Sequence, residues 1–312
     1  MSEKRIKVLY IVGNGRSGTT ILDIILGQLE GFFAVGELRR IWERTVLGNR
    51  PCGCGVPSHQ CPVWTEIFRE AYGGMDQVDA QRMQSLHDRY ALTKHLFGMM
   101  LDPQHKNPVN PEVQSYLDNL DKLYKAIQRV SKCKVIVDAS KWPMYAYFLD
   151  GLPALELYMV HVIRDPRAVA HSWGRKKEYE PGVMHPSQGA ARSTAYWVVW
   201  NPAIRYLWKR AGRNYLFLPY EEFVRRPREC VAEIVRFVGE DVRDLPFENE
   251  NTAVLKPTHA VAGNIARLTR GPVELKPDDE WKEKGSSVSN FVVSALGWPL
   301  MWRYGYFRGA KK

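Results

Sequence analysis

The sequence lacks several features that would assign it to particular classes of protein. It has no apolar run of about 18 residues, the length that a membrane-spanning helix needs, so we expect no membrane span. It has no internal repeat and no low-complexity tract, which excludes repeat architectures and long biased segments. Its first residues, MSEKRIK, lead at once into an apolar segment and leave no room for the apolar region of a signal peptide. We therefore expect a cytoplasmic protein.

Acidic residues are fewer than basic ones. The 312 residues include 34 Asp and Glu against 44 Lys and Arg, which gives a formal net charge of +10. Such an excess favours anionic partners. The basic residues are spread along the chain, and no recognised nucleic-acid-binding module accompanies them. We therefore expect no nucleic acid partner, and we attribute part of the excess to an anionic small molecule and the rest to a solvated surface.

Cysteine is scarce, with five residues in the chain. Cys133 and Cys230 lie in apolar contexts and are interpreted as core thiols. The other three are clustered: Cys52, Cys54 and Cys61. With His59 they have the composition of a zinc site, but their spacing is not a standard one. A disulfide is disfavoured in the cytosol. We predict a packed, thiol-rich loop and no metal site, and leave the other two readings open.

One stretch near the N-terminus organises the sequence. A β-branched apolar run at 8–12 predicts a buried strand, and apolar positions from Ile21 to Leu29 predict a helix. Between them lies a glycine-rich turn, Gly13 to Thr20. Strand, turn and helix in this order direct backbone N–H groups and the positive end of a helix at an anion. The turn has the G-x-x-x-x-G spacing of a P-loop, but Thr19 stands where a nucleotide triphosphatase has lysine. The pattern predicts a site for a phosphate-like group without the usual lysine and magnesium chemistry.

Four further apolar runs predict strands, and polar residues follow each of them. The runs are 32–35, 134–138, 155–163 and 214–218. Helical patterns alternate with these runs, which predicts a three-layer α/β domain of the P-loop type with a largely parallel sheet of about five strands. We expect a single domain over 1–312. A helical and loop insertion at about 40–130 is the region in which we expect an acceptor to bind.

The residues Arg16-Ser17-Gly18-Thr19-Thr20 resemble the loop of sulfotransferases that use 3'-phosphoadenosine 5'-phosphosulfate (PAPS). The signature of that family is a basic residue, then Ser-Gly-Thr or Ser-Gly-Ser, and one more hydroxyl. The resemblance implies that Gly15 to Thr20 hold the 5'-phosphosulfate group. A transferring sulfuryl group carries less negative charge than a phosphoryl group, so arginine, hydroxyls and backbone donors would stabilise it without a metal.

The same resemblance implies a set of catalytic residues. Gly36-Glu37 follows the second predicted strand, where related sulfotransferases have their catalytic base, so Glu37 would accept the proton of an acceptor hydroxyl. Asp138-Ala139-Ser140-Lys141 follows the third strand. In bacterial members of the family a lysine at this place contacts the bridging or sulfuryl oxygens. The resemblance therefore implies that Lys141, together with Arg16, stabilises the charge of the transition state.

Three further motifs resemble the nucleotide-binding part of the family. Arg164 and Ser172 have the spacing of the pair that binds the 3'-phosphate, and a guanidinium with a hydroxyl suits that group. Tyr220 takes the place of a tyrosine that contacts the adenine. The segment from His259 resembles a loop that closes over the cofactor, and its implied binding residues are Gly263, Asn264 and Arg267. The implied cofactor is PAPS, and the product is adenosine 3',5'-bisphosphate.

The sequence thus predicts a sulfotransferase that acts on a small molecule with a hydroxyl, or an amine, by in-line transfer with a carboxylate base. Two alternatives stay open. A P-loop kinase would use magnesium and ATP, with Asp138 at the metal. A non-catalytic protein would bind the nucleotide only. The acceptor is not predicted, and a homodimer is compatible with the sequence but not required by it.

Overall fold

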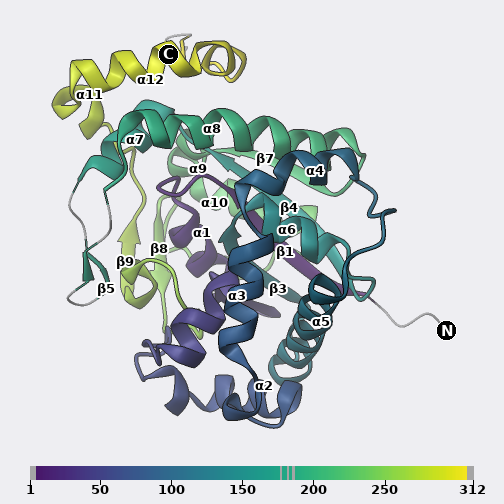
Figure 1. Ribbon diagram of the computed structural model, residues 1–312. Coiled ribbons are helices and arrows are strands. Elements are labelled where there is room, and N and C mark those ends of the chain that lie inside the picture. The colour runs from purple at the N-terminus through teal and green to yellow at the C-terminus, as the bar shows by residue number, and fades with distance from the viewer. Residues whose placement is uncertain (1–4, 176–177, 181–182, 185–186, 308–312) are drawn as a thin grey trace.

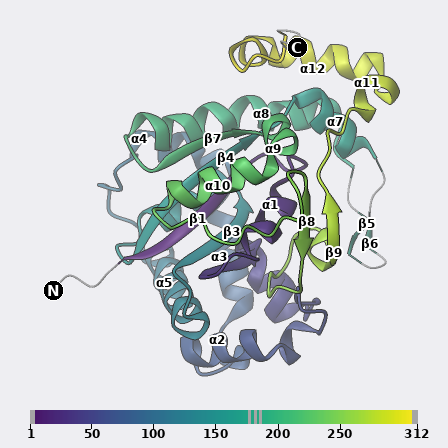
Figure 2. The same cartoon turned by 180° about the vertical axis from the view of Figure 1, so that it is seen from behind.

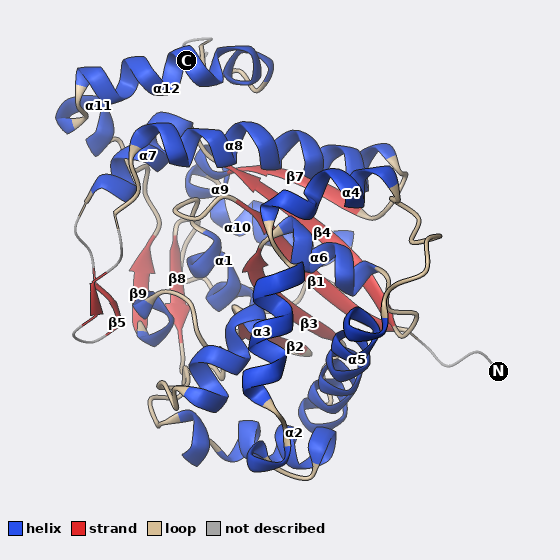
Figure 3. Ribbon diagram, viewed as in Figure 1, coloured by secondary structure: helices blue, strands red, loops and turns tan. Residues whose placement is uncertain are grey.

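A parallel β-sheet forms the centre of the computed structural model, which describes residues 5–175, 178–180, 183–184 and 187–307 (Figures 1 and 3). Its five strands have the order β2-β3-β1-β4-β7, and every neighbouring pair is parallel. The strands are β1 (Ile6–Gly13), β2 (Phe32–Gly36), β3 (Val135–Lys141), β4 (Leu155–Ile163) and β7 (Tyr215–Pro219). The predicted α/β fold with about five parallel strands is confirmed.

Strand β1 lies in the middle of the sheet and is buried on both faces. Val8, Tyr10 and Val12 belong to one buried cluster, and Leu9 and Ile11 belong to another. Successive side chains of a strand point to opposite faces, so a continuous apolar run is what a strand covered on both sides requires. The apolar run at 8–12 thus fixes the central position of β1.

Helices cover both faces of the sheet, as the two opposite views show (Figures 1 and 2). One face carries α1 (Thr19–Leu26), α9 (Tyr220–Arg225) and α10 (Pro227–Phe237). The other carries α5 (Pro111–Ser131), α6 (Pro143–Asp150) and α8 (Ala190–Ile204). Helix α7 (Pro166–Gly174) follows β4 and packs against α8. Among the described residues, no helix is long and apolar enough to span a membrane.

The insertion between β2 and β3 is helical, as predicted, but its first helix is interrupted. The pattern from Met83 to Met100 predicts one helix, whereas the structure has α3 (Ala80–Tyr90), a 3-10 turn at 93–95 and α4 (Leu96–Leu101). A second helical pattern, from Pro111 to Val130, predicts a helix that is confirmed as α5. The insertion also holds a π-helix (Ile41–Leu47) and α2 (Pro62–Tyr72), the latter packed against α5.

The C-terminal part returns to the sheet before it ends in helices. Strands β8 (Thr252–Leu255) and β9 (Gly271–Glu274) form an antiparallel pair. We call residues 256–270, which join them, the strap. The strap passes beside β2, where Val261 forms a parallel bridge with Gly36. Helices α11 (Glu280–Lys284) and α12 (Ser287–Arg303) follow, and α12 packs on α7 and α8. A short pair, β5 (Glu178–Glu180) and β6 (Val183–Met184), follows α7.

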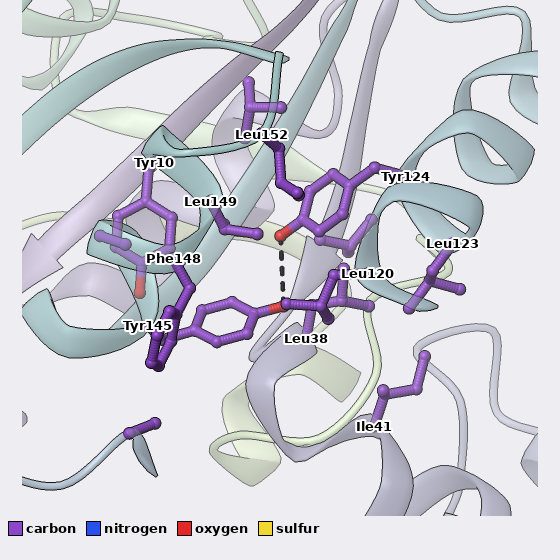
Figure 4. Close-up of a cluster of buried hydrophobic side chains, with 14 of the residues drawn as sticks. Tyr10, Leu38, Ile41, Leu120, Leu123, Tyr124, Tyr145, Phe148, Leu149 and Leu152 are labelled. Carbon is purple, nitrogen blue, oxygen red and sulfur yellow. Dashed lines mark hydrogen bonds between the residues drawn. The ribbon is translucent and has the colours of Figure 1, made fainter. Parts of the chain in front are cut away.

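A group of buried tyrosines packs between β1, β3, α5 and α6. Figure 4 shows the hydroxyls of Tyr124 and Tyr145 pointing toward each other, 3.4 Å apart. The Tyr124 hydroxyl also donates a hydrogen bond of 2.5 Å to the Asp138 carboxylate, and the Ser140 N–H donates another of 2.8 Å. Burial raises the pKa of Asp138 to about 6, although these hydrogen bonds oppose the rise. Tyr124 and the Ser140 N–H therefore satisfy a carboxylate that is completely buried.

Replacing Tyr124 by Phe removes one donor from this carboxylate. We expect the free energy of unfolding to fall by about 1–3 kcal/mol, the cost of leaving a buried acceptor unsatisfied. The cost should be larger at about pH 8 than at about pH 5, because Asp138 is ionised above its pKa and protonated below it. Denaturant unfolding at the two pH values measures both effects.

Tyr72→Phe is the matched control, since the Tyr72 hydroxyl donates to the uncharged carbonyl of Asn119. Its cost should not depend on pH. An equal pH dependence in both variants would show that Asp138 is not the source of the effect.

Candidate active site

The carboxyl ends of β1, β2, β3 and β4 surround a cavity of about 480 Å³. In an open α/β sheet this edge is where ligands bind. Eleven of the residues predicted for the site line the cavity: Gly15, Arg16, Gly18, Thr19, Thr20, Glu37, Lys141, Arg164, Ser172, Tyr220 and Asn264. The fold thus brings together motifs that are up to 249 positions apart in the sequence, from Gly15 to Asn264.

The turn between β1 and α1 has the strained backbone of an anion-binding loop. Gly18 has φ +74°, and a Cβ there would lie 2.7 Å from the ring of Tyr220, so glycine is required twice over. Arg16 also has a positive φ, of 71°, which a side chain rarely adopts. The Nε of Arg16 and the Oγ of Ser17 are buried without a hydrogen-bond partner among the described residues. Two donors therefore remain for a bound anion, although Ser17 lies behind the surface of the cavity.

The guanidinium of Arg16 lies over the ring of Trp173, 4.9 Å from its centre. Burial lowers the pKa of Arg16, and the nearby charge of Arg175 lowers it further. Both effects disfavour the cation, and a bound anion would relieve them. The position of Arg16 thus suits a negatively charged ligand.

Glu37 and Lys141 form a buried ion pair at the ends of β2 and β3. The Lys141 Nζ donates to Glu37 Oε1 over 2.5 Å, and an Arg39 nitrogen lies 3.5 Å from the other oxygen. Burial alone would raise the pKa of Glu37, but the charges of Lys141 and Arg39 outweigh it and lower the pKa to about 2. Lys141 itself has φ +70°, a strained conformation that directs its side chain into the site. Glu37 is therefore ionised. It can accept a proton only when Lys141 and Arg39 move away from it.

Asp138, the residue that a kinase would use for magnesium, does not line the cavity. Its carboxylate is buried and already accepts hydrogen bonds from Tyr124 and the Ser140 N–H. A P-loop kinase needs an acid that faces the nucleotide. The arrangement gives Asp138 a structural role.

Arg164, at the end of β4, lies over the ring of Tyr220 at 4.3 Å. It donates to the Arg16 carbonyl over 2.9 Å and pairs with Asp278 over 3.0 Å. Ser172 is two turns along α7 and nearly buried. One guanidinium therefore connects the phosphate loop, the aromatic ring and the segment after β9.

The strap covers the Glu37 side of the cavity. A Cβ at Gly263, which has φ +80°, would lie 3.0 Å from Glu37 Oε1. Asn264 lines the cavity, and its side chain caps the turn that follows by accepting from the Ala266 N–H. Arg267 is placed differently from its predicted role. It is 2% exposed, does not line the cavity, and donates to the carbonyls of Gly263 and Pro51. The Arg267 guanidinium therefore stabilises the strap, because it donates its hydrogen bonds to these two carbonyl groups.

Several residues of the cavity were not predicted from the sequence. Three aromatic side chains form one end: Trp142, Tyr196 and Trp200. Trp142 and Trp200 pack edge to face with ring centres 5.7 Å apart, and Tyr196 lies 5.2 Å from Trp200. Of the described residues in the insertion at 40–130, only Thr93 lines the cavity. Tyr196 and Trp200 lie on α8 and Trp142 lies between β3 and α6, and sequence spacing alone does not show that the three face one cavity.

Residues 9–244 match the model of the sulfotransferase family. The chain belongs to this family. Membership makes the protein a sulfotransferase, and it implies PAPS as the sulfuryl donor. No curated protein matches the sequence significantly.

Solved structures of sulfotransferase domains resemble the fold. The domain from the Synechococcus PCC 7002 olefin synthase has a TM-score of 0.53 at 19% identity, over 96% of each chain. The domain from the curacin biosynthetic pathway has a TM-score of 0.51 at 18% identity, over 94% of this chain and 98% of that one. At such identities the likeness concerns the fold alone, so the acceptors of those domains say nothing of the acceptor of this sulfotransferase.

The Glu37–Lys141 pair can be tested by a double-mutant cycle. Lys141→Met leaves a buried carboxylate with one cation fewer, so we expect the free energy of unfolding to fall by about 3–5 kcal/mol. Glu37→Gln should also destabilise, because Lys141 then lies buried without its carboxylate. The double variant should cost clearly less than the sum of the single ones.

Denaturant unfolding of the four proteins gives the coupling free energy. The control cycle is Arg40→Met with Glu43→Gln, a more exposed pair 3.0 Å apart whose coupling should be below about 1 kcal/mol. Additive costs at Glu37 and Lys141 would show that the two side chains do not interact.

Proposed function

We propose that this sulfotransferase moves the sulfuryl group of PAPS to the hydroxyl of a small, partly aromatic or apolar acceptor, with Glu37 as the base. The observation that carries the proposal is the buried Glu37–Lys141 pair, which lies in the same cavity as the phosphate loop. A carboxylate, a cation and a loop of backbone donors are the groups that this transfer needs.

The residues of the donor side fit the nucleotide. Gly15 to Thr20 would hold the 5'-phosphosulfate, since the loop presents N–H groups at the start of α1 and leaves the Arg16 Nε unpaired. Arg164 and Ser172 would hold the 3'-phosphate, and Tyr220 would contact the adenine. Asp278 now pairs with Arg164, and the phosphate would compete with it for the guanidinium. PAPS would supply a reactive sulfuryl group when bound, and the residues named above would orient it.

The proposed transfer depends on which group the Lys141 ammonium contacts. While its ammonium contacts Glu37, it is the largest of the charges that lower the pKa of that carboxylate. When Lys141 turns toward sulfuryl or leaving-group oxygens, Glu37 loses this contact and its pKa rises. Glu37 then becomes a stronger base for the acceptor proton. One lysine would therefore stabilise the transferred group and activate the base.

The acceptor end of the cavity is aromatic. Trp142, Tyr196 and Trp200 offer apolar faces, and Thr93 accepts a hydrogen bond from the Trp200 Nε1 over 3.3 Å. Arg192 lies over the Tyr196 ring at 5.8 Å. Aromatic walls with a few polar groups are typical of sites for apolar small molecules. An acceptor with an aromatic or aliphatic body and one hydroxyl suits these walls.

One prediction of the proposed transfer concerns the nucleotide. Adenosine 3',5'-bisphosphate should raise the melting temperature of the protein by several degrees at a concentration about 100 times its Kd, because it binds only the folded state. Leaving out magnesium should not change the shift, because no step of the proposed transfer uses this metal. ATP with magnesium should give a smaller shift. Differential scanning fluorimetry measures all three conditions, and a shift with magnesium ATP alone would favour the kinase alternative.

Another prediction of the proposed transfer concerns the base. Glu37→Gln should lower turnover by about 10²–10⁴-fold, the usual contribution of a positioned base, while the melting-temperature shift with the bisphosphate persists. Turnover can be followed as release of labelled sulfate from PAPS to water, or as transfer to an acceptor found by screening phenols and alcohols. Glu43→Gln is the control and should keep full activity. Activity of Glu37→Gln equal to the control would exclude Glu37 as the base and would favour another residue, or a protein that binds the nucleotide without using it.

A further inference from the structure

A cluster of four metal-ligating side chains lies outside the cavity. Cys52, Cys54 and Cys61 meet His259 of the strap, and their ligand atoms all lie within 4.8 Å of one another. The histidine that completes the cluster is distant in sequence. His59, the nearer candidate, instead donates from its Nε2 to the Val46 carbonyl over 2.8 Å. The sequence therefore showed the three thiols but not their fourth partner.

The distances within the cluster match a tetrahedral zinc site. Zinc lies about 2.3 Å from sulfur and about 2.0–2.1 Å from nitrogen, so tetrahedral angles give about 3.8 Å between sulfurs and about 3.6 Å between sulfur and nitrogen. The Cys54 and Cys61 sulfurs are 3.9 Å apart. The His259 Nδ1 lies 3.4 Å from the Cys61 sulfur and 3.8 Å from the Cys52 sulfur. A disulfide would need two sulfurs at about 2.05 Å.

The surroundings of the sulfurs favour thiolates that are neutralised by a cation. Cys61 precedes α2 as its N-cap, and the N–H groups of Val63 and Trp64 donate to its sulfur. The Cys54 N–H donates to the sulfur of Cys52. Backbone donors at a helix start stabilise negative charge on sulfur. A metal ion among the sulfurs would compensate the negative charge of thiolate ligands.

Outer contacts fix the ligands in place. The Trp64 Nε1 donates to the His259 carbonyl over 2.7 Å, and Phe33 stacks on the His259 ring. Gly53 N–H donates to the Ala260 carbonyl over 2.8 Å, and a Cβ at Gly53 would lie 2.8 Å from the Thr258 carbonyl. Only glycine lets the turn between the first two cysteines lie this close to the strap. Such outer support is typical of metal ligands.

We propose that Cys52, Cys54, Cys61 and His259 bind one zinc ion. Four protein ligands fill a tetrahedral shell and leave no position for a substrate, so the site is structural. Zinc at this place would tie the loop at 51–61 to the strap, four residues before Gly263 meets Glu37. Arg267 adds a second connection, to the Pro51 carbonyl. The ion would hold the segment that covers the catalytic base, without taking part in the transfer.

The metal content of the untagged, full-length protein tests the proposal directly. Mass spectrometry of the metals should find about one zinc ion per chain after gel filtration. Cys61→Ser should lose most of this zinc and melt at a lower temperature. Cys230→Ser is the matched control, because Cys230 is equally buried but lies outside the cluster. It should keep its zinc.

The wild-type protein provides a second readout if Cys61→Ser does not fold. Protein produced with cobalt in place of zinc should show the visible bands of tetrahedral cobalt and the near-ultraviolet band of thiolate ligation. Protein without zinc, iron in its place, a Cys54–Cys61 disulfide found by peptide mass, or full zinc retention in a folded Cys61→Ser would each overturn the proposal. None of these results depends on whether the protein binds PAPS.

Discussion

A carboxylate buried at the edge of the sheet, Glu37, stays ionised only because Lys141 and Arg39 lie beside it. Burial penalises the charged form, and the two cations more than offset that penalty. Because β2 and β3 are parallel neighbours, the residues that follow them meet at one edge. The candidate active site therefore depends on strand order, because separating the two strands would take the Lys141 ammonium away from Glu37.

Close backbone contacts bring a third segment to the same place. Gly36, with φ +76°, would clash through a Cβ with the Val261 carbonyl, and Gly263 leaves room for Glu37. The strap can lie this near only because both positions have no side chain. The cluster of three cysteines and His259 then connects the strap to the insertion. Glu37, the strap and the cysteine–histidine cluster thus form one continuous unit beside the glycine-rich turn at 13–20.

The parts that could be predicted from the sequence are those that local pattern determines. Apolar runs located the strands, because strands buried on both faces leave no alternation to interpret. The turn at 13–20 and Glu37 could be recognised because glycines and a charged residue directly after an apolar strand indicate the ligand-binding edge of an α/β sheet. Arg267 and His259 were misjudged or missed, because their partners, Pro51 and the three thiols, lie about 200 positions away. The aromatic end of the cavity likewise depends on how α8 is rotated, which sequence spacing alone does not determine.

The bridge between Gly36 and Val261 also determines how long β2 is exposed while the chain is being synthesised. Strand β2 is at the margin of the sheet, and an uncovered margin is a template for pairing with other chains. Its cover is made by a residue 225 positions further on, from 36 to 261. Until that residue has left the ribosome, the first half of the protein has an open strand. A chain that ends before residue 261 would therefore expose the margin of β2 to pairing with other chains.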